Sequence, residues 1–253
     1  MQSIVPVVFA TDDNFVSCCA VAIASLIHNC NKNRSYKLYI FYDTLSEANQ
    51  NKILTMAQEN VSIEFIHVNK YIDKKLYYVH GWQTVTTYFR FFAVDVLPQY
   101  DKILYLDCDI TILGDVGELY DIDIGNNLLG GVVIFRNKPH EIEAKAEYLM
   151  NTFGITPSEF INAGILSMNL KQFREENIKA KCIAYLQEHR NLKWMDQDVL
   201  NGVCKGRIHY ISEKWNKSQI YADADLVEEG TIGDTAIIHY LDRFKPWWVP
   251  FRP

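Results

Sequence analysis

The chain has 253 residues, 49% of them hydrophobic, which is enough to bury a core in one large α/β domain or two small domains. Its formal net charge of −6 at pH 7 argues against a nucleic-acid-binding surface, which would carry clustered Lys and Arg. An acidic chain can still bind an anionic substrate when a metal ion supplies positive charge.

The cysteines and the apolar segments indicate a cytoplasmic protein. The six cysteines show neither CxxC nor zinc-ligand spacing, so we expect free thiols in a reducing compartment. The charge-free segment 14–31 has an apolar part that ends at Ile27, which is shorter than the roughly 20 residues of a membrane span. Asn216-Lys217-Ser218 matches a glycosylation sequon, but without the basic region of a secretory signal we interpret it as coincidental.

Residues 1–70 alternate between strand and helix patterns. We expect strands at 4–10, 36–42 and 61–68, and helices at 16–28 and 46–58. This β-α-β-α-β order predicts a parallel, doubly wound sheet. The glycine-rich loops GxGxxG and GxxxxGK[ST] do not occur in the sequence, so a bound nucleotide would be held by other means.

The rest of the chain continues with mixed elements. We expect helices at 84–96, 139–153, 170–189 with a break near Asn177, and 196–203, and strands at 103–106, 110–113, 128–135, 163–168 and 236–240. The acidic stretch 115–123 is interpreted mostly as a solvated loop and the end of a helix. No repeat or linker divides the chain, so we expect one domain of residues 1–253, with a nucleotide-binding half of about 1–110 and an acceptor half of about 111–253.

Asp107-Cys108-Asp109 directly follows the apolar run 103–106. Two carboxylates at the end of a buried strand cannot both be buried as unpaired anions at modest cost. They indicate a divalent cation, at the strand end where open α/β sheets bind ligands. The alternative is that both aspartates cap the strand and face water.

His239 also follows an apolar run, Ala236-Ile237-Ile238. Two carboxylates and an imidazole suit Mn²⁺, whereas carboxylates alone would favour Mg²⁺ or Ca²⁺. Lys245 would add a second cation nearby if the intervening loop curls back. The alternatives are a hydrogen-bonded structural role for His239 and a paired structural role for Arg90 within its apolar helix face.

Six segments together resemble the retaining glycosyltransferases of family 8, in particular the bacterial lipopolysaccharide α-galactosyltransferases and glucosyltransferases. The resemblance extends from about Val7 to Trp247. The segments are FATDDNF (9–15), TTYFR (86–90), LYLDCDITIL (104–113), FINAGILSMNL (160–170), MDQDVLNGV (195–203), and IHY (238–240) with KPW (245–247).

The resemblance implies a GT-A type α/β fold, which is a Rossmann-like mixed, mostly parallel sheet with helices on both faces. It implies transfer of galactose or glucose from a UDP-sugar to a saccharide hydroxyl in lipopolysaccharide or other surface glycan synthesis, with Mn²⁺ or Mg²⁺ as cofactor. The acceptor could be lipid-linked, which is compatible with a cytoplasmic enzyme in peripheral contact with the inner face of the membrane.

The resemblance also implies residue roles. Asp107, Asp109 and His239 would hold the metal ion. The residues implied to contact the nucleotide or its diphosphate are Ala10, Asp12, Asn14, Arg90, Asp107, Cys108 and Lys245. Asn162, Asp196 and Gln197 would line the transferred sugar, and either Asp196 or the amide oxygen of Gln197 would stabilise the oxocarbenium-like carbon.

Two departures from the family pattern leave alternatives open. Ile134 stands where galactosyltransferase members carry an aspartate, and Asp242 stands where a glycine is usual. A non-catalytic sugar-nucleotide-binding relative is therefore one alternative. The other is a haloacid-dehalogenase-type phosphatase with Asp107 as nucleophile, although its GDxxxD signature fails at Leu119 and Ile238.

Overall fold

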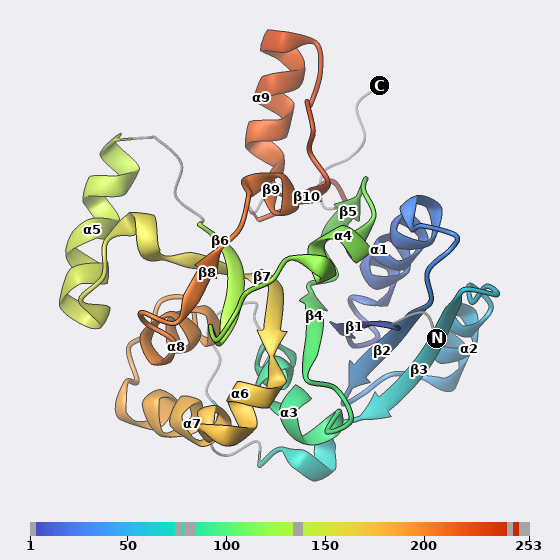
Figure 1. The fold of residues 1–253 in the computed structure, drawn as a ribbon, viewed down its shortest axis with the longest axis horizontal. Helices are drawn as coiled ribbons and strands as arrows, with labels where there is room; N and C mark the ends of the chain where they lie inside the picture. The colour runs from blue at the N-terminus through green and yellow to red at the C-terminus, as the bar shows by residue number, and fades with distance from the viewer. Residues whose placement is uncertain (1–3, 74–76, 78–83, 134–138, 242–244, 248–253) are drawn as a thin grey trace.

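The computed structural model describes residues 4–73, 77, 84–133, 139–241 and 245–247. Within these residues the strands form a seven-stranded sheet in the order β3-β2-β1-β4-β7-β6-β8 and a three-stranded sheet in the order β5-β10-β9 (Figure 1). Ile134 and Asp242, the two departures from the family pattern, lie outside the described residues.

The amino-terminal half forms the expected parallel β-α-β-α-β unit. Its elements are β1 (Val5–Ala10), α1 (Val16–Asn29), β2 (Tyr36–Tyr42), α2 (Glu47–Leu54) and β3 (Val61–His67). β1 pairs in parallel with β2 and with β4 (Lys102–Leu106). Helix α2 is shorter than the expected 46–58, because the chain turns after Leu54 and a bridge between Gln58 and Val61 leads it into β3.

The sheet becomes mixed beyond β4. Strand β7 (Ile161–Asn169) runs antiparallel between β4 and β6 (Leu129–Val133), and the short strand β8 (Ile208–Tyr210) pairs in parallel with β6. Strand β7 begins two residues before the expected 163–168, so Asn162 lies inside the strand. The sequence did not predict β8, since it is only three residues long and none of them is fully buried.

Helices cover both faces of the large sheet, as expected for this α/β fold. Alternate residues of β1 point into two cores, Val8 into one and Val7 and Phe9 into the other. Residues of α1, α2 and α4 (Val116–Asp121) pack into the core that contains Val7. The other core is covered by α5 (Pro139–Phe153), α6 (Leu170–Glu175), α7 (Ile178–Glu188) and α8 (Asp196–Val203).

Several helices differ from the expectation. Segment 84–96 is a 3₁₀ helix, η3 (Val85–Phe92), followed by α3 (Ala93–Val96). The five residues from Tyr88 to Phe92 are all buried, whereas residues 85–87 are partly exposed. The acidic stretch 115–123, expected as a loop and a helix end, contains the whole short helix α4, because Asp115 accepts a hydrogen bond from Gly117 N and caps the helix. The break near Asn177 is confirmed, with Asn177 at φ 53°.

The remaining short elements complete the chain. They are the 3₁₀ helices η1 (Asn69–Tyr71), η4 (Pro157–Glu159) and η5 (Glu213–Trp215), and the unexpected helix α9 (Gln219–Glu229). All six cysteines lie among the described residues and are free thiols, as expected. None of the helices in the described ranges combines the length and apolar character needed to cross a membrane.

The three-stranded sheet determines where the carboxyl end of the chain meets the end of β4. Strand β10 (Ile237–His239) lies antiparallel to β5 (Ile110–Ile112) and parallel to β9 (Lys217–Ser218). His239 is paired with Ile110 in this register. The pairing therefore carries His239 to the Asp107-Cys108-Asp109 segment.

Candidate active site

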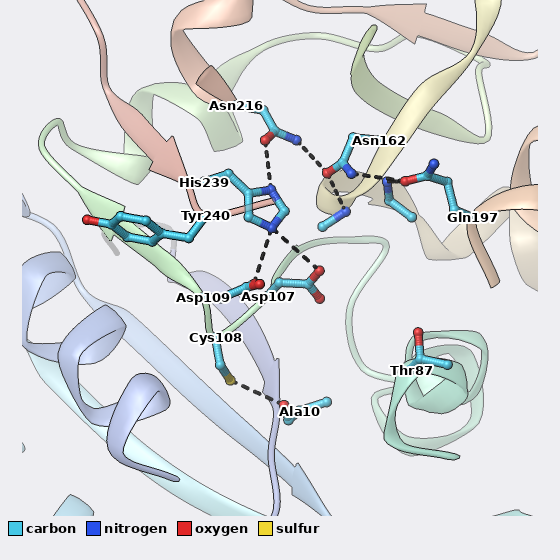
Figure 2. Close-up of polar contacts among 12 residues, drawn as sticks. Ala10, Thr87, Asp107, Cys108, Asp109, Asn162, Gln197, Asn216, His239 and Tyr240 are labelled. Carbon is cyan, nitrogen blue, oxygen red and sulfur yellow. Dashed lines mark hydrogen bonds and ion pairs between the residues drawn. The ribbon is translucent and has the colours of Figure 1, made fainter. Parts of the chain in front are cut away.

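Asp107, Asp109 and His239 form a cluster that could hold a metal ion, with one ligand atom of each within 4.8 Å of the others. Asp107 follows β4, Asp109 precedes β5, and His239 ends β10. His239 Nε2 lies 3.2 Å from Asp109 Oδ1 and 4.0 Å from Asp107 Oδ2 (Figure 2). The structure thus brings together the three residues that the sequence indicated as metal ligands.

The chemistry of this cluster fits a divalent cation. The side chain of His239 is 2% exposed, so its ring nitrogens depend on protein partners rather than water. Its Nδ1 lies 2.9 Å from Asn216 Oδ1, and its Nε2 faces the two carboxylates. A positive charge is required between Nε2 and these oxygens, which a proton or a metal ion can supply. Two carboxylates and an imidazole are ligands that Mn²⁺ accepts.

Lys245 is buried beside this cluster. Its Nζ donates hydrogen bonds to Asp109 Oδ2 and to the carbonyl oxygen of Tyr240. Burial opposes the ionisation of Asp109, but the contacts with His239 and Lys245 outweigh it and hold the pKa of this carboxyl well below its usual value. The ammonium group of Lys245 therefore lies at the metal cluster, where the sequence suggested a second cation.

Arg90 joins two carboxylates of the site. Its guanidinium lies 2.9 Å from Asp107 Oδ1 and 3.0 Å from Asp196 Oδ2, and its Cζ lies 4.2 Å from the centre of the Tyr105 ring. Burial lowers the pKa of Arg90, but the neighbouring carboxylates more than reverse this effect and raise the pKa above its ordinary value. Arg90 thus remains charged and orients Asp107 and Asp196, which corresponds to the paired role weighed for it above.

Asp196 and Gln197 begin helix α8, directly after Met195, whose φ of 49° is unusual for a residue other than glycine. Burial raises the pKa of Asp196 to about 6, although the charge of Arg90 opposes this shift. Thr87 Oγ1 donates a hydrogen bond to the same carboxylate. Asp196 is thus a buried carboxylate held by one cation and one hydroxyl.

The amide of Gln197 has a defined orientation. Its Oε1 accepts hydrogen bonds from Asn162 Nδ2 at 2.9 Å and from Ala163 N at 3.1 Å. Its Nε2 has no hydrogen-bond partner in the part of the chain that the structure describes. The amide nitrogen of Gln197 is therefore available to a ligand, while the role suggested for its oxygen stays a prediction.

Three of the residues expected to contact the nucleotide, Ala10, Asp12 and Asn14, lie between the end of β1 and the start of α1. Asp12 Oδ1 accepts hydrogen bonds from Asn14 N at 2.9 Å and Phe15 N at 3.0 Å, so it shapes the loop that enters α1. Cys108 Sγ donates a hydrogen bond to the carbonyl oxygen of Ala10 at 3.2 Å (Figure 2). This bond joins the Asp107-Cys108-Asp109 segment to the end of β1.

All of the residues expected in the site line one cavity of about 690 Å³. They come from both halves of the chain and are Ala10, Asp12, Asn14, Arg90, Asp107, Cys108, Asp109, Asn162, Asp196, Gln197, His239 and Lys245. Their proximity is a property of the structure, whereas their individual roles toward a nucleotide or a sugar remain predictions.

The sequence analysis did not identify three residues that touch this site. Thr87 bonds to Asp196, and Asn216 bonds to His239. A Cβ added to Gly164 would overlap the His239 ring and lie 2.6 Å from Asp107 Oδ2, so the site needs glycine there. Thr87 and Gly164 lie inside the quoted segments, and Asn216 lies in the sequon that we interpreted as coincidental.

The chain is similar over nearly its whole length to curated relatives. It is 29% identical over 253 residues to the lipopolysaccharide 1,3-galactosyltransferase of Salmonella typhimurium, covering 95% of this chain and 72% of that protein. It is 26% identical over 252 residues to the lipopolysaccharide 1,2-glucosyltransferase of Escherichia coli, with the same two coverages of 95% and 72%.

Solved structures share the fold. The bifunctional glycosyltransferase WbbM superposes with a TM-score of 0.81 at 27% identity, covering 98% of this chain and 47% of that chain. The galactosyltransferase LgtC superposes with a TM-score of 0.79 at 24% identity, covering 96% of this chain and 89% of that chain. The chain thus has the GT-A fold of these glycosyltransferases and spans about half the length of WbbM.

The sequence model described as "Glycosyl transferase family 8" matches residues 6–249. This match includes the Asp107-Cys108-Asp109 segment and gives no support to the haloacid-dehalogenase alternative. Because the match extends over nearly the whole chain, and because the carboxylate and imidazole cluster lies in a cavity at the end of β4, the protein belongs to glycosyl transferase family 8.

Proposed function

We propose that this chain is a metal-dependent, retaining hexosyltransferase that moves galactose or glucose from a UDP-sugar to a hydroxyl group of a saccharide. The observation that carries the proposal is the Asp107, Asp109 and His239 cluster in the wall of a cavity of about 690 Å³. A diphosphate brings two or more negative charges, and a cation held by this cluster would neutralise them.

The names of the relatives support a role in surface glycan synthesis. One is a lipopolysaccharide galactosyltransferase and another a lipopolysaccharide glucosyltransferase, so both hexoses are candidates for the donor. The proposed acceptor is a saccharide of a lipopolysaccharide or another surface glycan, presented on a lipid at the inner face of the membrane. The proposed location is therefore the cytoplasm, with peripheral membrane contact.

Asp107, Asp109 and His239 would hold Mn²⁺, with Mg²⁺ as the second candidate. The bound ion would act as a Lewis acid toward the departing diphosphate. The ammonium group of Lys245, which lies against Asp109, would stabilise the same negative charge as a fixed point charge.

The proposed reaction breaks the bond between the anomeric carbon and the diphosphate oxygen and forms a bond to the acceptor oxygen on the same face of the sugar. Because the acceptor attacks the face from which the diphosphate departs, the reaction needs no nucleophile from the protein. The proton of the acceptor hydroxyl passes to the departing phosphate oxygen, so no protein base is needed. Asp196 would place its negative charge beside the oxocarbenium-like carbon, and Gln197 Nε2 would donate a hydrogen bond to a sugar hydroxyl.

The test is the release of UDP from UDP-galactose and from UDP-glucose with Mn²⁺, with EDTA as control and a saccharide acceptor present or absent. Metal-dependent release supports the proposal. Saturable binding of the UDP-sugar without release would identify a non-catalytic relative. Release of phosphate from p-nitrophenyl phosphate with Mg²⁺, together with no release of UDP, would favour the phosphatase.

A further inference from the structure

A chain of side-chain hydrogen bonds connects the metal cluster to the sugar-binding side of the cavity. His239 Nδ1 lies 2.9 Å from Asn216 Oδ1, Asn216 Nδ2 donates to Asn162 Oδ1 at 2.8 Å, and Asn162 Nδ2 donates to Gln197 Oε1 at 2.9 Å (Figure 2). Each of the four side chains belongs to a residue at most 7% exposed. Buried amides without such partners would be costly, so this chain is held as a unit.

Two backbone N–H groups of β7 determine the direction of these hydrogen bonds. Gly164 N donates to Asn162 Oδ1 at 2.9 Å, and Ala163 N donates to Gln197 Oε1 at 3.1 Å. A backbone N–H can only donate, so both amide oxygens are fixed as acceptors. Asn216 must therefore turn its Nδ2 toward Asn162 and its Oδ1 toward His239.

This direction determines which nitrogen of His239 keeps its proton. Because Asn216 Oδ1 is an acceptor, His239 Nδ1 must carry hydrogen, and Nε2 becomes the nitrogen that can bind a metal ion. Without Asn216, the carboxylates of Asp109 and Asp107 would attract the single proton of the neutral ring to Nε2, which lies 3.2 Å and 4.0 Å from them. Metal binding would then have to displace that proton.

We propose that Asn216 is a positioning residue that serves both ends of the site. It holds His239 as the Nδ1–H tautomer. Its hydrogen bond to Asn162 also adds to those of the Ala163 and Gly164 N–H groups in holding Gln197 Nε2 toward the donor sugar. The second part rests on the proposed function, whereas the first concerns only the metal cluster. Asn216 reaches this place because β9, which begins at Lys217, pairs with β10 and places Ser218 beside His239.

Two substitutions of Asn216 distinguish its effect on the metal cluster from its effect on the donor-sugar side. Asn216→Ala removes both hydrogen bonds. Asn216→Asp keeps an acceptor for His239 Nδ1 but has no donor for Asn162 Oδ1, and its carboxylate would repel that oxygen. We expect Asn216→Ala to weaken Mn²⁺ binding by roughly 10- to 100-fold, the range usual for outer-shell partners of metal-bound histidines. Asn216→Asp should bind Mn²⁺ at least as tightly as the unmodified protein.

The effect on the donor side is tested by comparing the Kd for UDP with the Kd for the UDP-sugar at saturating Mn²⁺. Asn216→Asp should leave the Kd for UDP unchanged and raise the Kd for the UDP-sugar, because only the sugar would contact Gln197. Both constants are measured by titration calorimetry in the presence of metal and need no turnover. Equal effects on UDP and UDP-sugar would overturn the link to the donor sugar.

The tautomer can be observed directly. A long-range ¹H–¹⁵N spectrum of the metal-free protein at pH 8 should show His239 protonated at Nδ1, and the Asn216→Ala variant should show the proton at Nε2. A His239 that carries hydrogen at Nε2 and none at Nδ1 in the unmodified protein would overturn the proposal. So would a folded Asn216→Ala variant with unchanged Mn²⁺ affinity.

Asn169→Ala is the matched control. Asn169 donates to the carbonyl oxygens of Gly125 and Asn127 and accepts from Gln172 N, so the variant also loses amide hydrogen bonds, but outside the residues that line the cavity. It should lower the melting temperature and leave Mn²⁺ affinity unchanged. Absence of UDP release by the unmodified protein would refute the proposed function alone, since the Mn²⁺ titration and the tautomer spectrum do not depend on turnover.

Discussion

His239 Nε2 lies 3.2 Å from Asp109 Oδ1, although 130 positions of sequence separate the two residues. The contact is set by the pairing of two three-residue strands, in which His239 stands opposite Ile110 and Tyr240 N donates to the carbonyl oxygen of Asp109 at 3.0 Å. Backbone hydrogen bonds between these strands therefore position the cluster of Asp107, Asp109 and His239. Such rigidity would suit the proposed metal site.

Mn²⁺ should stabilise the fold. A ligand that binds the folded state alone at a concentration of 100 times its Kd adds about 2.7 kcal/mol to the free energy of unfolding. For a chain of this size that corresponds to a rise in melting temperature of roughly 5–10 °C. Thermal unfolding followed by circular dichroism, with and without excess EDTA, measures the rise. A His239→Ala variant that shifts as much as the unmodified protein would contradict the assignment.

Asp109→Asn should remove both metal binding and metal-dependent UDP release. It should also destabilise the metal-free protein by about 3 kcal/mol, because the buried ammonium of Lys245 loses its charged partner. Urea unfolding and calorimetric Mn²⁺ titration measure the two effects. Asp101→Asn is the control, since the exposed pair of Asp101 with Arg174 should change stability by less than about 1 kcal/mol. Retained Mn²⁺ affinity in Asp109→Asn would show that Asp109 is not a ligand.

Gly164→Ala should damage the metal site more than the fold. The added methyl group would overlap the His239 ring and crowd Asp107 Oδ2, so we expect Mn²⁺ affinity to fall by at least about 10-fold. Gly130→Ala provides a matched change in β6, where the added Cβ would lie 2.9 Å from Ile124 Cγ2 instead. That variant should lose stability and keep its Mn²⁺ affinity. The same loss of affinity in both variants would point to a general disturbance of the sheet.

Because of Asp196, the free energy of unfolding should fall as the pH rises from about 4 to 6. Its pKa is raised from 3.8 to about 6 in the folded protein, so the folded state holds more protons than the unfolded state in this window. The stabilisation that the protonated carboxyl of Asp196 contributes is fully present below about pH 4 and is lost as the pH rises through 6. Relative to Asp196→Asn, the unmodified protein should lose up to about 3 kcal/mol across the window. Denaturant unfolding of both proteins at intervals from pH 4 to 7 measures the difference, and parallel curves would contradict it.

Local patterns predicted most of the elements. The apolar runs of β1, β2 and β4, the boundaries of α8 and the break at Asn177 all follow from short stretches of sequence. The patterns did not predict α9, whose Leu226 and Val227 are exposed and form no periodic buried face. They predicted a helix over 84–96 but not the 3₁₀ geometry of 85–92, because an apolar side that includes Tyr88, Phe91 and Phe92 fits either kind of helix.

The sequence by itself determined which residue types would carry the chemistry, because an aspartate pair after a buried strand and a histidine after another apolar run already demand a compensating charge. Only the tertiary structure decided how those groups are oriented. The polarity of the amide chain depends on two N–H groups of β7. Ala163 N donates to Gln197 of α8, and Gly164 N donates to Asn162 Oδ1, which also accepts from Asn216 in the segment before β9. No local pattern contains the contacts that Gln197 and Asn216 make with β7 and β10, because these contacts form only when distant segments pack together. Asn216 could therefore be identified from the structure and not from the sequence.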